Sequence, residues 1–153
     1  MSTQKKVAIA CDHAGTELKK AVAAMLEKRG FAIEDFGTHG NDSVDYPDFA
    51  SEVSRRVGSG DAAFGLLVCG TGIGMSIVAN KYRGVRAALC HTEFEARATR
   101  QHNDANVLCL GERVVGLGLG VAIAEAFYDT QFEGGRHMRR VQKIADAEAE
   151  NSR

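Results

Sequence analysis

The chain has 153 residues, a length that fits one domain with a substantial hydrophobic core. Its hydrophobic fraction of 44% excludes a disordered chain, and its net charge of −1 argues against a partner such as nucleic acid or an anionic membrane. The sequence has no apolar signal segment and no run long enough to span a membrane. We therefore expect a cytoplasmic protein.

Strand-like and helix-like patterns alternate along the chain. The pattern predicts a strand over residues 7–11, a helix over 16–29 and a strand over 31–36, followed by a polar loop over 37–48. A helix over 49–57, a strand over 63–69, a helix from 76 and a strand over 86–90 come next. The capping box Thr92-x-x-Glu95 opens another helix, and a strand over 107–110 and helices over 114–128 and 137–150 complete the chain.

This alternation predicts a single domain over residues 1–153 in the α/β class. We expect a three-layer, Rossmann-like α/β/α fold with a five-stranded parallel sheet and a C-terminal helix. Ligands of such open sheets bind beyond the carboxyl ends of the strands. The segments expected at that edge are Cys11-Asp12-His13, residues 69–74 and Cys90-His91. A thiol, a carboxylate and imidazoles are therefore predicted to share one edge.

The glycine-rich turn after the third strand is the strongest functional candidate. It reads Cys69-Gly70-Thr71-Gly72-Ile73-Gly74, so its bare N–H groups can face one concavity and bind an anion. A P-loop needs Lys and then Ser or Thr after its last glycine, and a dinucleotide-binding turn needs a glycine where Met75 stands. Met75 also replaces the arginine of a thiol-phosphatase loop. A tight turn beside a buried, inert cysteine remains the alternative.

Other polar residues are weaker candidates when taken one at a time. Asp12 and His13 follow the first strand directly, and a helix start there would favour an anion; Asp12 as a simple helix cap is the alternative. His102 and Asn103 fall in a polar segment before the fifth strand, where an ordinary turn would also explain Asn103 and Asp104, and His102 could be a simple surface histidine. Arg136 and Arg140 lie on one face at the start of the last helix, opposed to its dipole, which favours a phosphate-binding role.

The cysteines give little support for a metal site or a disulfide. The four, which lie near the ends of strands, are Cys11, Cys69, Cys90 and Cys109, and none forms a Cys-x-x-Cys pair. Buried thiols in a reducing compartment fit this spacing. We therefore expect no metal site.

Six motifs in this order resemble the type B ribose-5-phosphate isomerases, a family that also includes galactose-6-phosphate and allose-6-phosphate isomerases. The resemblance runs from residue 7 to about residue 144. Its markers are Cys11-Asp12-His13, Asp45-Tyr46-Pro47, residues 69–74, Ala79-Asn80-Lys81, residues 100–106 and Gly134-Gly135-Arg136-His137. A second branch of the family has a glutamate at the position of Met75 and lacks the cysteine, so this chain resembles the cysteine branch.

The resemblance implies interconversion of D-ribose 5-phosphate and D-ribulose 5-phosphate, a step of the pentose phosphate pathway, through an enediolate and without metal or cofactor. Cys69 would be the base that moves a proton between C1 and C2, and His102 would open the furanose ring, with Asp12 and Thr71 nearby. The backbone of residues 70–74 would hold the enediolate. The remaining substrate contacts implied are His13, Tyr46, Gly70, Gly72, Ile73, Gly74, Asn103, Arg113, Arg136 and Arg140.

The resemblance also implies a homodimer, or a dimer of dimers, whose sites combine residues of two subunits. Two alternatives stay open. The substrate could be another phosphosugar, such as allose 6-phosphate, galactose 6-phosphate or a tetrose phosphate, with residues 37–48 setting the choice. A non-catalytic phosphosugar sensor would keep Arg136 and Arg140 but would need neither Cys69 nor His102, so the presence of all four favours an enzyme.

Overall fold

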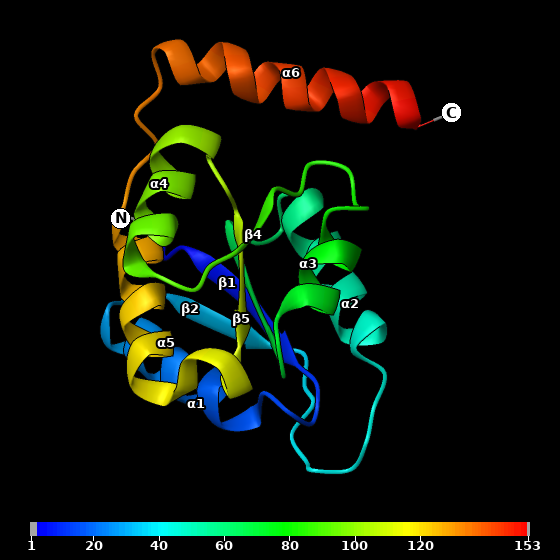
Figure 1. Ribbon diagram of the computed structural model, residues 1–153, viewed down its shortest axis with the longest axis vertical. Coiled ribbons are helices and arrows are strands. Elements are labelled where there is room, and N and C mark those ends of the chain that lie inside the picture. The colour runs from blue at the N-terminus through cyan, green and yellow to red at the C-terminus, as the bar shows by residue number, and fades with distance from the viewer. Residues whose placement is uncertain (1–2, 153) are drawn as a thin grey trace.

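A parallel sheet forms the centre of the computed structural model, which describes residues 3–152 (Figure 1). Its strand order is β2-β1-β3-β5-β4, and every neighbouring pair is parallel. The strands of this described part are β1 (Lys6–Cys11), β2 (Ala32–Asp35), β3 (Phe64–Cys69), β4 (Ala87–Leu89) and β5 (Val107–Gly111). The three-layer fold and all five predicted strands are confirmed, because each observed end lies within one residue of its prediction.

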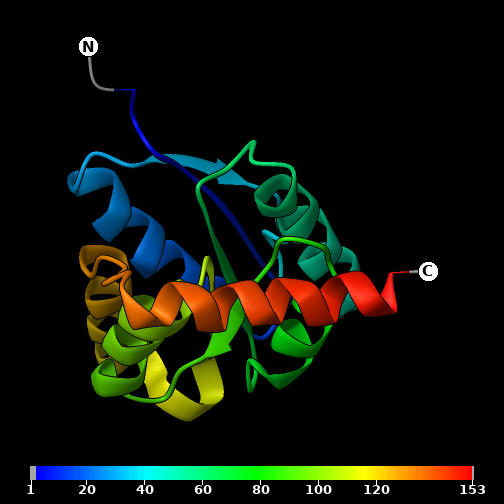
Figure 2. The same ribbon diagram turned by 90° about the horizontal axis from the view of Figure 1, so that it is seen from above.

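Helices cover both faces of the sheet. Their bounds are α1 (Thr16–Lys28), α2 (Tyr46–Gly58), α3 (Ile73–Ala79), α4 (Glu93–Asn103), α5 (Glu112–Asp129) and α6 (Arg136–Asn151). The helices α1, α4 and α5 pack on one face and α2 and α3 on the other, and Figure 2 shows the two groups on opposite sides of the strands. The predicted α/β/α layering therefore holds.

Strand β1 explains why the fold has two separate cores. Val7 and Ile9 face the core under α1, α4 and α5, whereas Ala8 and Ala10 face the core under α2 and α3. All four side chains are fully buried. A strand covered on both faces needs a continuous apolar run rather than an alternating one, which is the pattern that the sequence has here.

The helix ends show where local chemistry was readable from the sequence. The capping box is confirmed: Glu95 donates its N–H to Oγ1 of Thr92 at 3.1 Å, and the N–H of His91 donates to the Glu95 carboxylate at 2.9 Å. Helix α2 begins three residues earlier than predicted, with Pro47 in its first turn, where no N–H is needed. Helix α5 begins at Glu112 and is interrupted at Gly116, whose φ of 67° is not helical.

Helix α6 lies outside the three layers. It crosses above the amino ends of the strands, on the side opposite to the loop that follows β2 (Figure 1). Only His137 of this helix is buried. Among residues 3–152, we find no helix whose length and apolar character would let it cross a membrane.

Candidate active site

A cavity of about 430 Å³ opens at the carboxyl ends of β1 and β3. This is the edge at which open parallel sheets bind ligands. Nine of the residues predicted for the site line this cavity, together with Ala14 and Ile77, which the sequence analysis missed; the nine are Asp12, His13, Tyr46, Cys69, Gly70, Thr71, Ile73, Gly74 and Arg113.

The Cys69 sulfur is held at the mouth of the glycine-rich turn. Cys69 is the last residue of β3 and is 6% exposed. Gly72 caps α3 in a left-handed conformation, with φ of 76°, and this turns its N–H back to donate to the sulfur at 3.1 Å. A backbone donor at that position orients the sulfur toward the turn, and the thiolate is the form of cysteine that can accept a proton.

The other three cysteines differ from Cys69 in environment. They are held as neutral thiols inside the protein, because burial raises the pKa of Cys11 to about 11 and that of Cys90 to about 12, and raises the pKa of Cys109 further. None of the three lines the cavity. All four cysteines are free, as expected.

Asp12 and His13 are oriented by backbone N–H groups. Asp12 accepts from the N–H of Ala14 at 2.9 Å and is 7% exposed, so it shapes the turn before α1. Helix α1 begins only at Thr16, which means that the carboxylate is not the cap of that helix. Nδ1 of His13 accepts from the N–H of Val44 at 3.2 Å. In the neutral ring, the proton therefore resides on Nε2.

A buried lysine fixes the loop that carries Val44. The ammonium group of Lys19 lies 2.7 Å from the carboxylate of Asp35 and donates to the carbonyl of Thr38 at 2.9 Å, and its side chain is 2% exposed. Asp35 is the last residue of β2, and Thr38 lies at the beginning of the segment between β2 and α2. The ion pair thus ties this segment to α1, and the segment in turn holds the ring of His13.

Tyr46 and Arg113 complete the wall from two other elements. A Cβ placed on Gly74 would lie 2.5 Å from the ring of Tyr46, so the ring rests directly on this glycine. The side chain of Arg113 lies over Gly70, at 3.4 Å from a Cβ placed there, and the backbone N–H of Arg113 donates to the Gly70 carbonyl at 3.1 Å. A cation therefore faces the turn from α5.

Four of the predicted site residues lie elsewhere in the chain. His102 and Asn103 form the end of α4 and lie just before the amino end of β5. Cys69 is paired with Gly111, which is at the carboxyl end of β5. The four residue steps of β5 span about 13 Å. Arg136 and Arg140 are in α6, which also lies at the amino edge (Figure 1). The expectation that His102 sits in a loop is wrong, because it belongs to the last helical turn.

Cys90 and His91 were expected at the same edge as Cys69 and do follow β4 there. They do not line the cavity, because β4 is the edge strand and β5 lies between it and β3. The prediction that these groups share one edge of the sheet therefore holds, although Cys90 and His91 lie outside the cavity itself.

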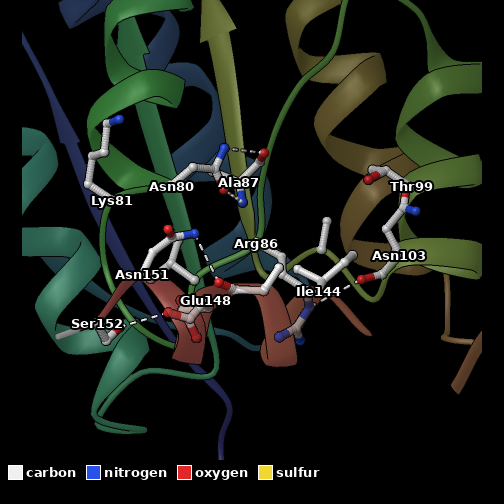
Figure 3. A pocket seen from close by; sticks show the side chains of 13 residues that line it. Asn80, Lys81, Arg86, Ala87, Thr99, Asn103, Ile144, Glu148, Asn151 and Ser152 are labelled. Atoms are coloured by element: carbon white, nitrogen blue, oxygen red, sulfur yellow. Dashed lines mark hydrogen bonds between the residues drawn. The ribbon is translucent and has the colours of Figure 1, made fainter. Parts of the chain in front are cut away.

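A second, larger cavity of about 640 Å³ lies beside α6, and Figure 3 shows its lining. Asn103 lines this cavity rather than the one at Cys69. Glu148 of α6 approaches the body of the protein there, accepting from the N–H of Gly84 at 3.1 Å. This contact holds the far end of α6 against the segment between α3 and β4.

His102 instead meets the beginning of α6. Its ring stacks on that of His137, with centroids 4.5 Å apart and planes at 19°. Nε2 of His137 lies 3.4 Å from the carboxylate of Glu133. Burial, and then the neighbouring His102 and Arg136, lower the pKa of His137. The sequence analysis gave Glu133 no role, because an isolated acid in a loop has no pattern.

Fold and cavity together define an α/β protein whose glycine-rich turn presents a thiol beside backbone N–H groups. The profile of the family described as Ribose/Galactose Isomerase matches residues 7–144. Ribose-5-phosphate isomerase B of Escherichia coli is 47% identical over 144 residues, which cover 94% of this chain and 97% of that protein. The chain belongs to the ribose/galactose isomerase family, and it is an isomerase.

Solved structures agree over almost the whole chain. Ribose-5-phosphate isomerase B of Clostridium thermocellum superposes with a TM-score of 0.93 at 52% identity, covering 96% of this chain and 99% of that one. Ribose-5-phosphate isomerase B of Mycoplasma genitalium, solved with bound ribulose-5-phosphate, gives a TM-score of 0.93 at 42% identity. The match covers 98% of this chain and 100% of that one.

Proposed function

We propose that this chain, acting as a single-domain subunit, interconverts D-ribose 5-phosphate and D-ribulose 5-phosphate. The observation that carries the proposal is the Cys69 sulfur, which accepts the Gly72 N–H at 3.1 Å beside a cavity of about 430 Å³. Relatives named as ribose-5-phosphate isomerases, one of them with bound ribulose-5-phosphate, support the choice of substrate.

The reaction moves one hydrogen from C2 to C1 of the open-chain sugar. The Cys69 thiolate removes the C2 proton, and the electron pair forms the C1–C2 double bond as the aldehyde oxygen becomes an enediolate oxygen. A proton then passes from the C2 hydroxyl to the C1 oxygen, the proton held by Cys69, or one exchanged with solvent, is delivered to C1, and the carbonyl reforms at C2. Backbone N–H groups of residues 70–74 stabilise the enediolate, which is the charge that develops during proton transfer.

The phosphosugar must first open its ring, and we assign this acid/base step to His102. Since His102 lies at the opposite edge of the sheet from Cys69, the site takes His102 from a second subunit of a homodimer. Arg136 and Arg140 lie near His102, so they reach the substrate phosphate from that same second subunit. His13 and Arg113 bind from the first subunit.

The surface around the cavity favours such pairing. Ile73 and Ile77, which line it, are 51% and 56% exposed, and Val114, Leu117 and Leu119 of α5 are also largely exposed. Clusters of exposed aliphatic side chains are typical of surfaces that meet another protein. A second copy would cover them and complete the site.

Exchange of the substrate C2 proton with deuterium from solvent tests the role of Cys69. The variant Cys69→Ala should lose both turnover and exchange, while Cys90→Ala, which removes a buried thiol outside the cavity, should keep them. The wild-type enzyme should also prefer ribose 5-phosphate in a panel of aldose phosphates. Retained exchange in Cys69→Ala would contradict the assignment.

Subunit mixing tests the shared site. Cys69→Ala chains and Arg136→Ala/Arg140→Ala chains should each be inactive alone. In an equal, random mixture, half of the dimers are mixed and each holds one intact site, so about a quarter of wild-type activity should return. If mixed dimers form and no activity returns, Cys69 and the arginines do not serve one site from different subunits.

A further inference from the structure

Three side chains with metal-binding atoms meet where α4, α6 and the segment before α6 converge. One ring nitrogen of His102, one of His137 and a carboxylate oxygen of Glu133 all lie within 4.8 Å of one another. This group is outside the cavity that contains Cys69. The proposed reaction uses only His102 from it, so Glu133 and His137 have no assigned task.

The backbone holds these three residues together without help from their side chains. The N–H of Glu133 donates to the carbonyl of Gln101, the residue before His102, at 3.2 Å. The N–H of His137 donates to the carbonyl of Gly134 at 3.1 Å, which closes the first turn of α6 onto the Glu133 segment. The side chains therefore start from fixed positions, and only their own torsions need to adjust for a ligand.

We propose that His102, Glu133 and His137 form a binding site for a divalent transition metal of the Zn²⁺ class. Two imidazoles and one carboxylate are a donor set that Zn²⁺ and Co²⁺ favour, and three protein ligands leave the remaining position to water. With bonds of about 2.1 Å, tetrahedral donors lie about 3.4 Å apart. His137 and Glu133 already meet this spacing, at 3.4 Å.

His102 is the ligand that must move. The two rings are stacked with planes at only 19°, whereas a metal lies close to the plane of each imidazole that binds it. A rotation of the His102 ring about its own side-chain torsions therefore accompanies binding. The Glu133 side chain is 51% exposed and can follow the metal, whereas the His137 side chain, at 7%, is fixed.

Nearby positive charge limits the affinity of the site. Arg136 and Arg140 lie close enough to influence the His137 ring, and a bound cation would feel the same charges. We therefore expect reversible binding that the enzyme does not need for turnover. The consequence rests on the proposed function: a metal on the His102 nitrogen prevents that nitrogen from exchanging a proton with the sugar, so Zn²⁺ inhibits ring opening.

Titration of the tag-free wild-type protein with Co²⁺ tests the site directly. One Co²⁺ per chain should bind and give the visible absorption of a nitrogen- and oxygen-ligated ion, without a sulfur-to-metal charge-transfer band. The variant Glu133→Gln removes a charged ligand from an exposed position and should weaken binding at least about tenfold. His91→Gln, which removes an exposed histidine elsewhere, is the matched control and should bind like the wild type.

Zn²⁺ inhibition of isomerisation provides the second readout. Glu133→Gln should keep its basal activity and need at least about tenfold more Zn²⁺ for half inhibition. A charge-transfer band that disappears in Cys69→Ala, or equal Co²⁺ affinity in Glu133→Gln and wild type, would overturn the site. Binding at this site without inhibition would uphold the site and contradict the role of His102, so the two proposals fail separately.

Discussion

Replacing Gly72 with alanine tests whether the conformation of the glycine-rich turn controls both stability and catalysis. Gly72 has φ of 76°, and an added Cβ would lie 2.6 Å from a methyl carbon of Leu89 and 2.8 Å from the backbone carbonyl carbon of Leu110. The left-handed conformation costs an alanine about 1–2 kcal/mol. Pressing a methyl group into backbone adds about 1–3 kcal/mol, so the variant should lose about 2–5 kcal/mol of unfolding free energy.

Gly30 provides the matched control. Its φ is 86°, and nothing lies within 4 Å of a Cβ added there, so Gly30→Ala carries the conformational cost of about 1–2 kcal/mol alone. The smaller entropy of the unfolded alanine chain affects both variants equally and cancels in the comparison. The difference between them therefore measures the contact of position 72 with Leu89 and Leu110.

Urea denaturation and steady-state kinetics together provide the assay. Relief of the clash must shift the turn and lengthen the hydrogen bond from the N–H of residue 72 to the sulfur of Cys69, so we expect kcat to fall at least about tenfold, while Gly30→Ala keeps full activity. Equal stability losses in the two variants, with normal activity in Gly72→Ala, would refute the reasoning.

Four further predictions concern ring opening, metal independence and the capping box. His102→Ala should slow turnover of the cyclic sugar about 10²–10⁴-fold but spare proton exchange on an acyclic analogue, and equal losses on both would indicate a binding role. Activity should survive exhaustive chelation, because proton transfer here needs only thiol, imidazole and amide groups; loss that one specific ion restores would contradict this. Thr92→Ala should lower the free energy of unfolding by about 1 kcal/mol. The N–H of His91, and then the Thr92 hydroxyl, lower the pKa of Glu95. The Glu95 carboxylate therefore stabilises the fold above the ordinary glutamate pKa, and this stabilisation is lost as pH falls below that value toward the lowered pKa. Thermal melts of Glu95→Gln should accordingly approach those of the wild type in acid.

Much of the fold was predictable because its causes are local. The buried strands are continuous apolar runs, and Thr92 and Glu95 form their cap through contacts within one helical turn. The limits of α2 and α5 were less readable. At Gly116 the residue type permits a helix break without requiring it, so its φ of 67° depends on how the two halves of α5 pack.

Some residues of the candidate site were likewise predictable from their order along the chain, and others were not. Cys69 and Asp12 follow their strands, so order along the chain places them at the carboxyl edge. His102 precedes its strand, and the same rule places it at the opposite edge, although the sequence analysis did not apply the rule to it. Glu133 lies four residues before His137 and contacts it locally, but His102 joins the two only through the packing of α4 against α6, which the sequence does not show.

The alternation of strands and helices, the two-sided core and the glycine-rich turn at Cys69 were all readable in the chain alone, because each of these depends on residues adjacent in the chain. The tertiary structure decided which side chains line the cavity, how Lys19 and the segment after β2 hold His13, and that His102 and Arg136 lie at the edge opposite to Cys69. Such relations depend on contacts between distant segments, whose geometry follows from packing the whole chain and not from any local pattern.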